Sequence, residues 1–421
     1  MATLIFSFSI VNFALIYLAK RSYRNRFTVI IQFVIGALII ELAIFHAALN
    51  LIFMVMAIGD FTNWHFDTVL GFGLCAYNAF ILWQIHNSAE CVRTPLNSAL
   101  VDQFGEHFID KVNTERKELI KDQSSTSIWL KPFSLNRKMI ETIENIAYGD
   151  DPQNTLTVYR PKETDAATPL PIMLQIHGGG WILSYSDKQA LPLRNQLVEG
   201  GWIFIAINYR LSPNAKFPDH LIDCKKALLW IKNNIQKFGG DPNFVMVTGG
   251  SAGGHLASLC ALTDNQHQNI LQPGFEEVTL PSIRGCIPFY GVYDFTDLNH
   301  HRNKVPILPF LEKTVMPETL ESNPELWNLA SPIKQTQNQQ QPFFIIHGKL
   351  DTLAFIEEAK AFFVSLQSNG KSTASFAELE TTQHAFDLFN SPHAIISVYF
   401  THIFCELIYS EFLQENAKEQ T

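Results

Sequence analysis

One stretch of the chain, FVMVTGGSAGG at residues 244–254, decides the fold. Its first four residues are apolar and include two valines, which is typical of a buried strand, and the largely apolar residues 252–262 predict a helix. The Gly-x-Ser-x-Gly pattern between them is that of a nucleophile elbow, a tight strand-to-helix turn that exposes a serine. Gly249 and Gly253 would relieve the crowding around the strained Ser251. The alternative, a purely structural glycine turn, is less consistent with the strand and helix on either side.

Apolar strands and amphipathic helices alternate on both sides of this turn. Runs of strand length occur at residues 156–159, 172–176, 203–207, 285–290, 343–346 and 374–379. Helical patterns occur at residues 219–238, 356–366 and 394–412. This alternation predicts an α/β domain with a mostly parallel sheet and helices on both faces. We expect it to span residues 151–415, with an insertion near 295–331 that could form part of a lid, after a helical linker or cap at 91–150.

A glycine-rich loop follows the strand predicted at residues 172–176. It reads His177-Gly178-Gly179-Gly180-Trp181. Consecutive glycines leave backbone amides free to point at a developing oxyanion, and a backbone amide at the start of the helix after Ser251 can do the same. We expect His177 to order this loop and Trp181 to line a substrate pocket. A plain turn after a strand is the alternative.

A serine nucleophile needs a base, and the base needs an acid to orient it. Asp351 follows the strand predicted at 343–346, and His384 follows the strand predicted at 374–379. The chain order Ser251, Asp351, His384 is that of serine hydrolases built on a strand–turn–helix elbow. Asp294 and Asp387 are rival acids, but Asp294 precedes the expected strand and Asp387 is only three residues from His384.

These motifs together resemble a known family of enzymes, the α/β-hydrolase esterases of the hormone-sensitive-lipase group. The resemblance covers about residues 150–410 and rests on residues 177–181, 208–213, 239–242 and 249–254 together with Asp351 and His384. It implies an α/β-hydrolase fold, with Ser251 as nucleophile, His384 as base and Asp351 as its partner. It also implies an oxyanion hole made by the amides of Gly178, Gly179 and Ala252. The N-terminal apolar segment departs from most soluble members and puts their usual cap in doubt.

The first ninety residues have the composition of a membrane segment. Three apolar stretches cover residues 2–19, 28–58 and 69–85, and a helix of about 20 residues crosses a bilayer core. The middle stretch is too long for a straight crossing, so it either tilts or lies partly in the interface. A secretory signal is the alternative for the first stretch, but its positive charges follow the apolar run instead of preceding it. We expect residues 1–90 to form about three membrane helices.

Basic residues predict the orientation of this segment. The loop between the first two apolar stretches carries Lys20, Arg21, Arg24 and Arg26. The loop at 59–68 has acidic residues and no Lys or Arg. The positive-inside rule therefore places the N-terminus outside and the α/β domain on the cytoplasmic face, whereas a hairpin within residues 28–58 would add a fourth crossing and reverse this. We expect Glu41, within an apolar stretch, to face other helices, with Asn50 or Asn78 as its partner.

Charge and cysteine content exclude several other classes. The chain has 421 residues with 31 Lys+Arg against 40 Asp+Glu. Its four N-terminal basic residues are balanced by four acidic ones, so the net charge of −9 belongs to the remainder. An acidic domain argues against nucleic-acid binding, which needs a basic face. The six cysteines include no C-x-x-C pair, so neither a zinc site nor a disulfide framework is indicated.

The sequence thus predicts a membrane-anchored serine hydrolase that cleaves carboxylic esters through an acyl-enzyme intermediate. Its expected partners are the lipid bilayer and a small-molecule or lipid-derived ester, and no metal or organic cofactor is expected. An amide or formamide hydrolase would use the same groups, because several such enzymes share the serine and oxyanion motifs. A catalytically inactive membrane interaction protein is the alternative from another class, and the presence of all three triad candidates disfavours it.

Overall fold

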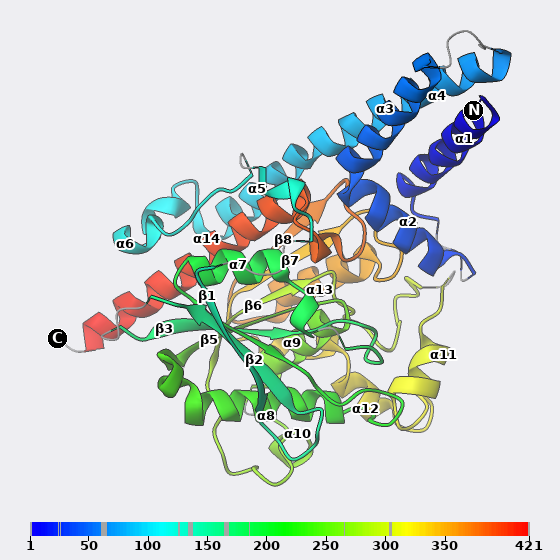
Figure 1. Ribbon diagram of the computed structural model, residues 1–421. Coiled ribbons are helices and arrows are strands. Elements are labelled where there is room, and N and C mark those ends of the chain that lie inside the picture. The colour runs from blue at the N-terminus through cyan, green and yellow to red at the C-terminus, as the bar shows by residue number, and fades with distance from the viewer. Residues whose placement is uncertain are drawn as a thin grey trace.

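A single eight-stranded sheet organises the computed structural model (Figure 1). The structure describes residues 2–23, 25, 27–59, 65–124, 127–133, 138–163, 168–184, 186–264, 266–302 and 305–419. The strands are β1 Ile140–Ala147, β2 Thr155–Pro161, β3 Leu170–Ile176, β4 Ile203–Ile207, β5 Gly240–Gly250, β6 Ile283–Phe289, β7 Phe343–Gly348 and β8 Ala374–Leu379. They lie in the order β1-β2-β4-β3-β5-β6-β7-β8. The strands from β4 to β8 are parallel, whereas β2 is antiparallel to both of its neighbours.

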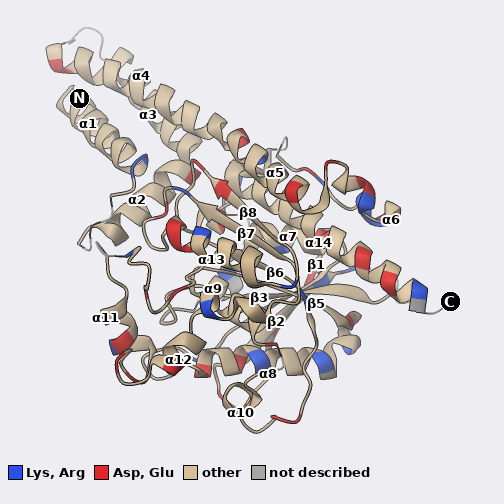
Figure 2. Cartoon of the chain, turned by 180° about the vertical axis from the view of Figure 1, so that it is seen from behind, with Lys and Arg blue, Asp and Glu red and all other residues tan. Residues whose placement is uncertain are grey.

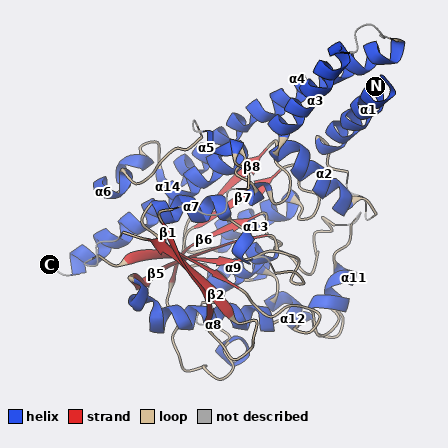
Figure 3. Cartoon of the chain, viewed as in Figure 1, coloured by secondary structure: helices blue, strands red, loops and turns tan. Residues whose placement is uncertain are grey.

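Helices cover both faces of the sheet (Figure 3). On one face lie α8 Asp219–Asn234, α9 Ala252–Leu262 and α13 Ile356–Asn369. On the other lie α5 Arg93–Phe104, α7 Leu191–Glu199 and α14 Pro392–Glu419. Side chains alternate between the two cores along each strand: in β3, Ile172 and Leu174 face the first group of helices and Met173 the second. The predicted mostly parallel sheet with helices on both faces is confirmed, because strands buried on both sides must be apolar throughout.

The segment at 91–150 differs from its prediction as a helical linker. It contains α5 and the short helix α6 Thr114–Lys117, but it ends in the edge strand β1. Ile140, Ile143 and Ile146 recur at intervals of three, which resembles a helical pattern. The register of β1 on β2 shifts between Ile143 and Ile146, where Asn145 has a φ of 59°. Because of this bulge Ile143 and Ile146 both pack against the first core although they are three residues apart, whereas Ile140 packs against the second core.

Short helices complete the α/β domain. One of them, α10 Gln268–Leu271, follows α9, and two others, α11 Leu308–Phe310 and α12 Pro324–Leu329, lie within the predicted insertion at 295–331. The insertion packs into the core through the buried side chains of Leu311, Val315 and Trp327. It is therefore anchored to the same core as the sheet and is not a separate domain.

Four apolar helices precede the α/β domain. They are α1 Ala2–Ala19, α2 Val29–Glu41, α3 Ala43–Gly59 and α4 Phe66–Asn87. The apolar stretch at 28–58 is two helices, α2 and α3, that meet at an angle of 78° next to Leu42. In Figure 1, α1, α3 and α4 project together away from the sheet while α2 lies against the α/β domain. In Figure 2 the outer parts of these helices are almost free of charged residues.

By length and composition, three of the described helices could cross a membrane, or four with the bent α2–α3 pair counted as one span. The candidates are residues 2–19, 66–104 and 392–418, but in the last of them 89% of the apolar 18-residue stretch is buried, and this helix is α14 of the α/β domain. Two buried asparagines of the projecting helices donate hydrogen bonds within the bundle: Asn50 to Asn12 Oδ1 over 3.2 Å, and Asn78 to the Ser9 carbonyl over 2.9 Å. Such bonds are typical of packed helices in an apolar phase.

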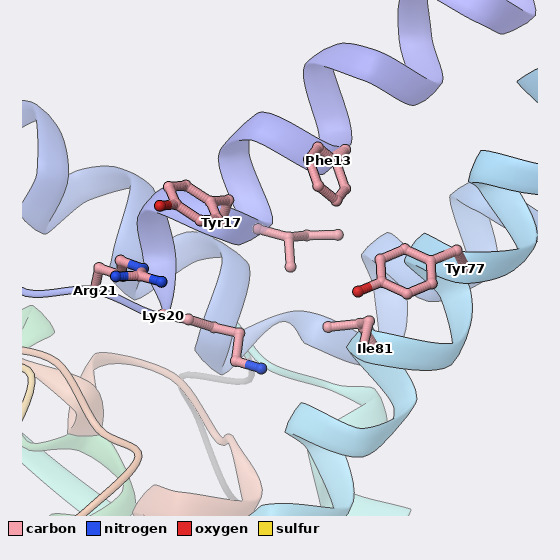
Figure 4. Close-up of a pocket in the computed structure, with 7 residues that line it drawn as sticks. Phe13, Tyr17, Lys20, Arg21, Tyr77 and Ile81 are labelled. Carbon is pink, nitrogen blue, oxygen red and sulfur yellow. The ribbon is translucent and has the colours of Figure 1, made fainter.

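A groove of about 390 Å³ separates α1 from α4 (Figure 4). Phe13, Tyr77 and Ile81 form much of its apolar wall, and Lys20 and Arg21 lie at one end. The guanidinium of Arg21 lies 4.8 Å from the centre of the Tyr17 ring. The basic end of this groove therefore lies where α1 reaches the level of the α/β domain.

Candidate active site

The turn between β5 and α9 holds Ser251 in a strained conformation. Its φ of 58° and ψ of −122° lie in a region that non-glycine residues rarely adopt. A Cβ on Gly253 would lie 2.0 Å from the carbonyl oxygen of Ile176, and a Cβ on Gly249 would lie 2.5 Å from the same oxygen. Only glycine fits at these two positions, so the Gly-x-Ser-x-Gly pattern is a steric requirement of this turn. The turn has the geometry that the sequence predicted for a nucleophile elbow.

The loop after β3 passes close to this serine. A Cβ on Gly178 would lie 3.3 Å from the Ser251 Cβ. The His177 ring stacks on Tyr209 at a centroid distance of 4.2 Å, and its Nδ1 lies 2.7 Å from the Gly178 carbonyl oxygen. Burial lowers the pKa of His177 to about 4, so its ring is neutral at physiological pH. These contacts fit the predicted role of His177 in ordering the loop.

The three amides predicted for an oxyanion hole differ in their hydrogen bonding. The Gly178 N–H donates to Gln189 Oε1 over 2.7 Å, so it is not a free donor in this structure. The prediction missed this because Gln189 lies eleven residues along the chain and reaches back to the loop. The amides of Gly179 and Ala252 have no acceptor among the residues that the structure describes. Gly179 has a φ of 114°, which favours glycine, and a Cβ there would lie 2.4 Å from the Leu183 carbonyl oxygen.

Asp351 and His384 lie side by side at the carboxyl ends of β7 and β8. His384 Nδ1 lies 2.7 Å from Asp351 Oδ2, and both side chains are buried. Asp351 Oδ1 accepts hydrogen bonds of 2.8 Å from the backbone amides of Leu353 and Ala354. Burial would raise the pKa of Asp351, but its attraction to His384 and its contact with His347 outweigh burial and hold that pKa well below its usual range. The carboxylate is therefore charged and fixed in orientation.

Among the described residues, neither Asp294 nor Asp387 forms a hydrogen bond with the His384 ring. Asp294 caps its own loop, where its carboxylate accepts from the backbone amides of Thr296 and Leu298. Asp387 accepts a hydrogen bond from the Tyr290 hydroxyl, and burial raises its pKa. The geometry therefore favours Asp351 as the acid that orients His384.

Three residues that were not predicted from the sequence, Tyr290, His347 and Gln383, lie around the candidate site. The Tyr290 ring lies 4.7 Å from the His384 ring, and a Cβ on Gly250, next to Ser251, would lie 2.7 Å from the Tyr290 hydroxyl. Tyr290 thus links the serine turn to His384. His347 Nε2 lies 3.3 Å from Asp351 Oδ2 and 2.8 Å from the Ala354 carbonyl oxygen. In the sequence, the only indication of a role for His347 is its position four residues before Asp351.

Gln383 ties together the loops that carry the acid and the base. Its Oε1 accepts a hydrogen bond of 2.9 Å from the Thr352 amide and another of 2.9 Å from the His384 amide. The side chain is fully buried. Because Thr352 follows Asp351, this one side chain joins the loop of Asp351 to the loop of His384.

Trp181, which we expected to line a substrate pocket, is buried beneath the site. Its Nε1 donates to His255 Nδ1 over 3.3 Å, and its ring meets Phe295 edge to face at 5.2 Å. Phe295 lies at the start of the predicted insertion, so Trp181 joins the glycine-rich loop to that insertion. A role in a substrate pocket stays a prediction.

The sheet order, with a strained Gly-x-Ser-x-Gly turn after β5, is that of the α/β-hydrolase fold, and comparison with known proteins relates the chain to esterases. A family model described as BD-FAE matches residues 156–366, about half of the chain. The chain belongs to the BD-FAE family. This match, together with the relatives and the solved structure described next, confirms the resemblance to esterases with an α/β-hydrolase fold.

Two curated relatives come from Mycobacterium tuberculosis. The chain is 43% identical over 251 residues to a protein named probable carboxylic ester hydrolase LipM, covering 59% of this chain and 57% of LipM. It is 38% identical over 297 residues to esterase LipQ, covering 70% of this chain and 69% of LipQ. The chain thus matches less than two thirds of LipM. The predicted enzyme class is confirmed in that the curated homologues are carboxylic ester hydrolases or esterases.

The fold is shared with a solved esterase structure. Esterase B from Lactobacillus rhamnosis superposes with a TM-score of 0.56 at 22% sequence identity, over 68% of this chain and 90% of that one. The two proteins therefore share the arrangement of the sheet and its helices.

Proposed function

We propose that the protein is a serine carboxylesterase in which Ser251 is the nucleophile, His384 the base and Asp351 the acid that orients the base. The observation that carries this proposal is the buried His384–Asp351 hydrogen bond of 2.7 Å at the sheet edge that also presents the strained Ser251 turn. The esterase names of the relatives LipM and LipQ support ester bonds over amide bonds.

The proposed reaction follows from these groups. Ser251 Oγ attacks the ester carbonyl carbon while His384 Nε2 accepts its proton, and the Asp351 carboxylate stabilises the resulting imidazolium. The amides of Gly179 and Ala252 hold the oxyanion. Collapse of the tetrahedral intermediate transfers the proton to the departing alcohol and leaves an acyl-enzyme. A water molecule, deprotonated by His384, then releases the carboxylic acid.

The test is covalent labelling by a fluorophosphonate probe, which reacts with activated serines. The full-length protein should be labelled, and Ser251→Ala should lose both the label and hydrolysis of p-nitrophenyl acetate. Ser368→Ala is the matched control, because Ser368 is exposed on α13 and donates only to the Val364 carbonyl. Well-folded protein that takes no label would refute the proposal. Matched ester and anilide substrates would show whether amide hydrolysis competes.

We also propose that α1, α3 and α4 cross a membrane and that the α/β domain lies on the cytoplasmic face. The support is the apolar exterior of these helices, which is almost free of charged residues, and the position of Lys20 and Arg21 after the end of α1 next to the α/β domain. With α2 outside the core of the bilayer, three crossings place the N-terminus on the other side. Alkaline phosphatase, which is active only outside the cytoplasm, should be inactive when fused to the C-terminus. An active fusion would reverse the orientation.

A further inference from the structure

Helix α2 lies directly on the loops that carry the proposed acid and base. The Phe33 ring meets the His384 ring edge to face at a centroid distance of 5.6 Å. One turn further on, a Cβ on Gly36 would lie 3.0 Å from Gln383 Nε2, so the absence of a side chain there lets the helix approach closely. The Val29 carbonyl accepts a hydrogen bond of 3.4 Å from the Thr352 hydroxyl. The helix is thus a wall of the candidate active site.

Both ends of α2 are tied to their surroundings. At its C-terminal end, Glu41 Oε2 lies 3.1 Å from His393 Nδ1 at the start of α14, and both side chains are buried. This partner differs from the expected Asn50 or Asn78 and lies in the α/β domain. Near its N-terminal end, Gln32 donates to the Arg21 carbonyl, and the Ser22 hydroxyl donates to the Asp351 carbonyl over 3.5 Å. The helix and the loop before it are therefore built into the α/β domain.

The opposite face of α2 is an exposed row of apolar side chains. Ile30, Ile31, Val34 and Leu38 are 67%, 62%, 45% and 41% exposed. The bend of 78° sets α2 across the direction of α3, which runs with α1 and α4 in the projecting bundle (Figure 1). If that bundle crosses a bilayer, α2 lies close to the plane of its surface. An apolar face at that depth is typical of an interfacial helix.

A cavity of about 610 Å³ opens along this same helix. Leu18, Ile31 and Ile35 supply apolar lining, and Ser22 and Gln32 supply polar lining. Its volume falls within the range of small-molecule sites, about 300–1,000 Å³. Ser22, one of the lining residues, also donates to the Asp351 carbonyl, so one edge of the cavity lies next to the loop that carries Asp351.

We propose that α2 is an interfacial wall between lipid and catalytic residues, and that the substrate is a long-chain ester dissolved in the bilayer, whose chain passes along α2 and against Phe33. This inference rests on the proposed esterase function. An ester of this kind keeps its carbonyl near the membrane surface and its chain in the apolar phase, which matches the depth of an interfacial helix. The His384 side chain, 4% exposed as a residue, lies behind Phe33. Phe33 is thereby a specificity-determining residue.

The first test compares two esters with the protein reconstituted in phosphatidylcholine vesicles. One is water-soluble p-nitrophenyl acetate, and the other is p-nitrophenyl palmitate dissolved in the vesicles. Phe33→Ala should lower the ratio of kcat/KM for palmitate over acetate at least fivefold, and Phe33→Leu should restore most of it. Phe80→Ala is the matched control, since Phe80 is an exposed phenylalanine of α4 and should leave the ratio unchanged.

The outcomes separate the two proposals. Hydrolysis of acetate with no hydrolysis of palmitate, or with a ratio unaffected by Phe33→Ala, would overturn the inference and leave the esterase intact. Hydrolysis of neither ester, together with no fluorophosphonate label at Ser251, would overturn the proposed function.

The second test locates α2 without using activity. In a Cys91→Ser background, which removes the exposed native thiol, Val34→Cys and Val364→Cys each carry an environment-sensitive fluorophore. Both valines are exposed, but Val34 is on α2 and Val364 is on α13. Lipids brominated on the upper acyl carbons should quench the probe at Val34 and not the probe at Val364. Equal quenching, or none at Val34, would refute the interfacial position.

Discussion

Replacing Asp351 by asparagine isolates one hydrogen bond of the candidate site. Asp351 Oδ1 accepts two backbone amides at 2.8 Å, and an asparagine can satisfy both only by placing its carbonyl oxygen there. Its NH2 group then occupies the position of Oδ2 and faces His384 Nδ1. Two donors cannot face each other, so His384 must hold its proton on Nε2. In that tautomer it cannot accept the proton of Ser251.

The expected cost of Asp351→Asn is large. In serine proteases the equivalent tautomer error lowers kcat about ten-thousand-fold, which corresponds to about 5.4 kcal/mol at about 1.36 kcal/mol for each factor of ten. The assay is the steady-state kcat for p-nitrophenyl acetate, with KM measured alongside, because a defect in proton transfer lowers kcat and leaves binding nearly intact. Asp294→Asn and Asp387→Asn are the matched controls and should lose much less.

Two results would refute this reasoning. A loss below about tenfold in Asp351→Asn would mean that the acid does not set the tautomer of His384. A loss of kcat at Asp387 or Asp294 as large as that at Asp351 would assign the role of the acid to that residue.

Stability at low pH gives an independent check. Because folding lowers the pKa of Asp351, its carboxylate stabilises the folded state above about pH 4 and loses this effect as the pH falls further. Asp351→Asn should lack that contribution.

Three further predictions concern packing around the site. Gly253→Ala should lower the midpoint of thermal unfolding in detergent by several degrees, because its Cβ would meet the Ile176 carbonyl oxygen at 2.0 Å; an unchanged midpoint would contradict the steric argument. Gln383→Ala should lower kcat about tenfold with little change in KM, by removing the acceptor that joins two loops; an effect on KM alone would indicate a binding role. Glu41→Ala should destabilise the fold by about 1–3 kcal/mol, because it leaves the buried Nδ1 of His393 without its hydrogen-bond partner, whereas an effect below about 0.5 kcal/mol would show that the pair is dispensable.

Much of the α/β domain followed from local patterns in the sequence. The apolar runs that predicted strands at 172–176 and 203–207 fall within or coincide with β3 and β4, and the run at 374–379 coincides with β8. Helix α9 begins at Ala252 and ends at Leu262, the bounds expected from the sequence. These elements were predictable because each is either apolar throughout or periodic.

The features that local patterns missed depend on contacts between distant segments. The bulge in β1 disguised a strand as a helix, and the bend between α2 and α3 divided one continuous apolar stretch. The partner of Glu41 lies 352 positions along the chain. Gln189, which engages Gly178, carries no motif. In each case the deciding interaction is tertiary, so neither composition nor periodicity reports it.

Helix α4 does not end in a flexible linker. It passes through the short turn Ser88–Val92 into α5, whose Leu96, Ala99 and Leu100 are buried over the sheet. The projecting helices are therefore joined to the α/β domain by a continuous helical connection, so the tilt of one part sets the tilt of the other. On a membrane such a molecule cannot tumble at the end of a tether, so Ser251 keeps one height and one tilt relative to the membrane surface while the molecule rotates about the membrane normal. Deletion of residues 1–87 would also remove α2 and with it the side of the helix that covers His384 and Gln383.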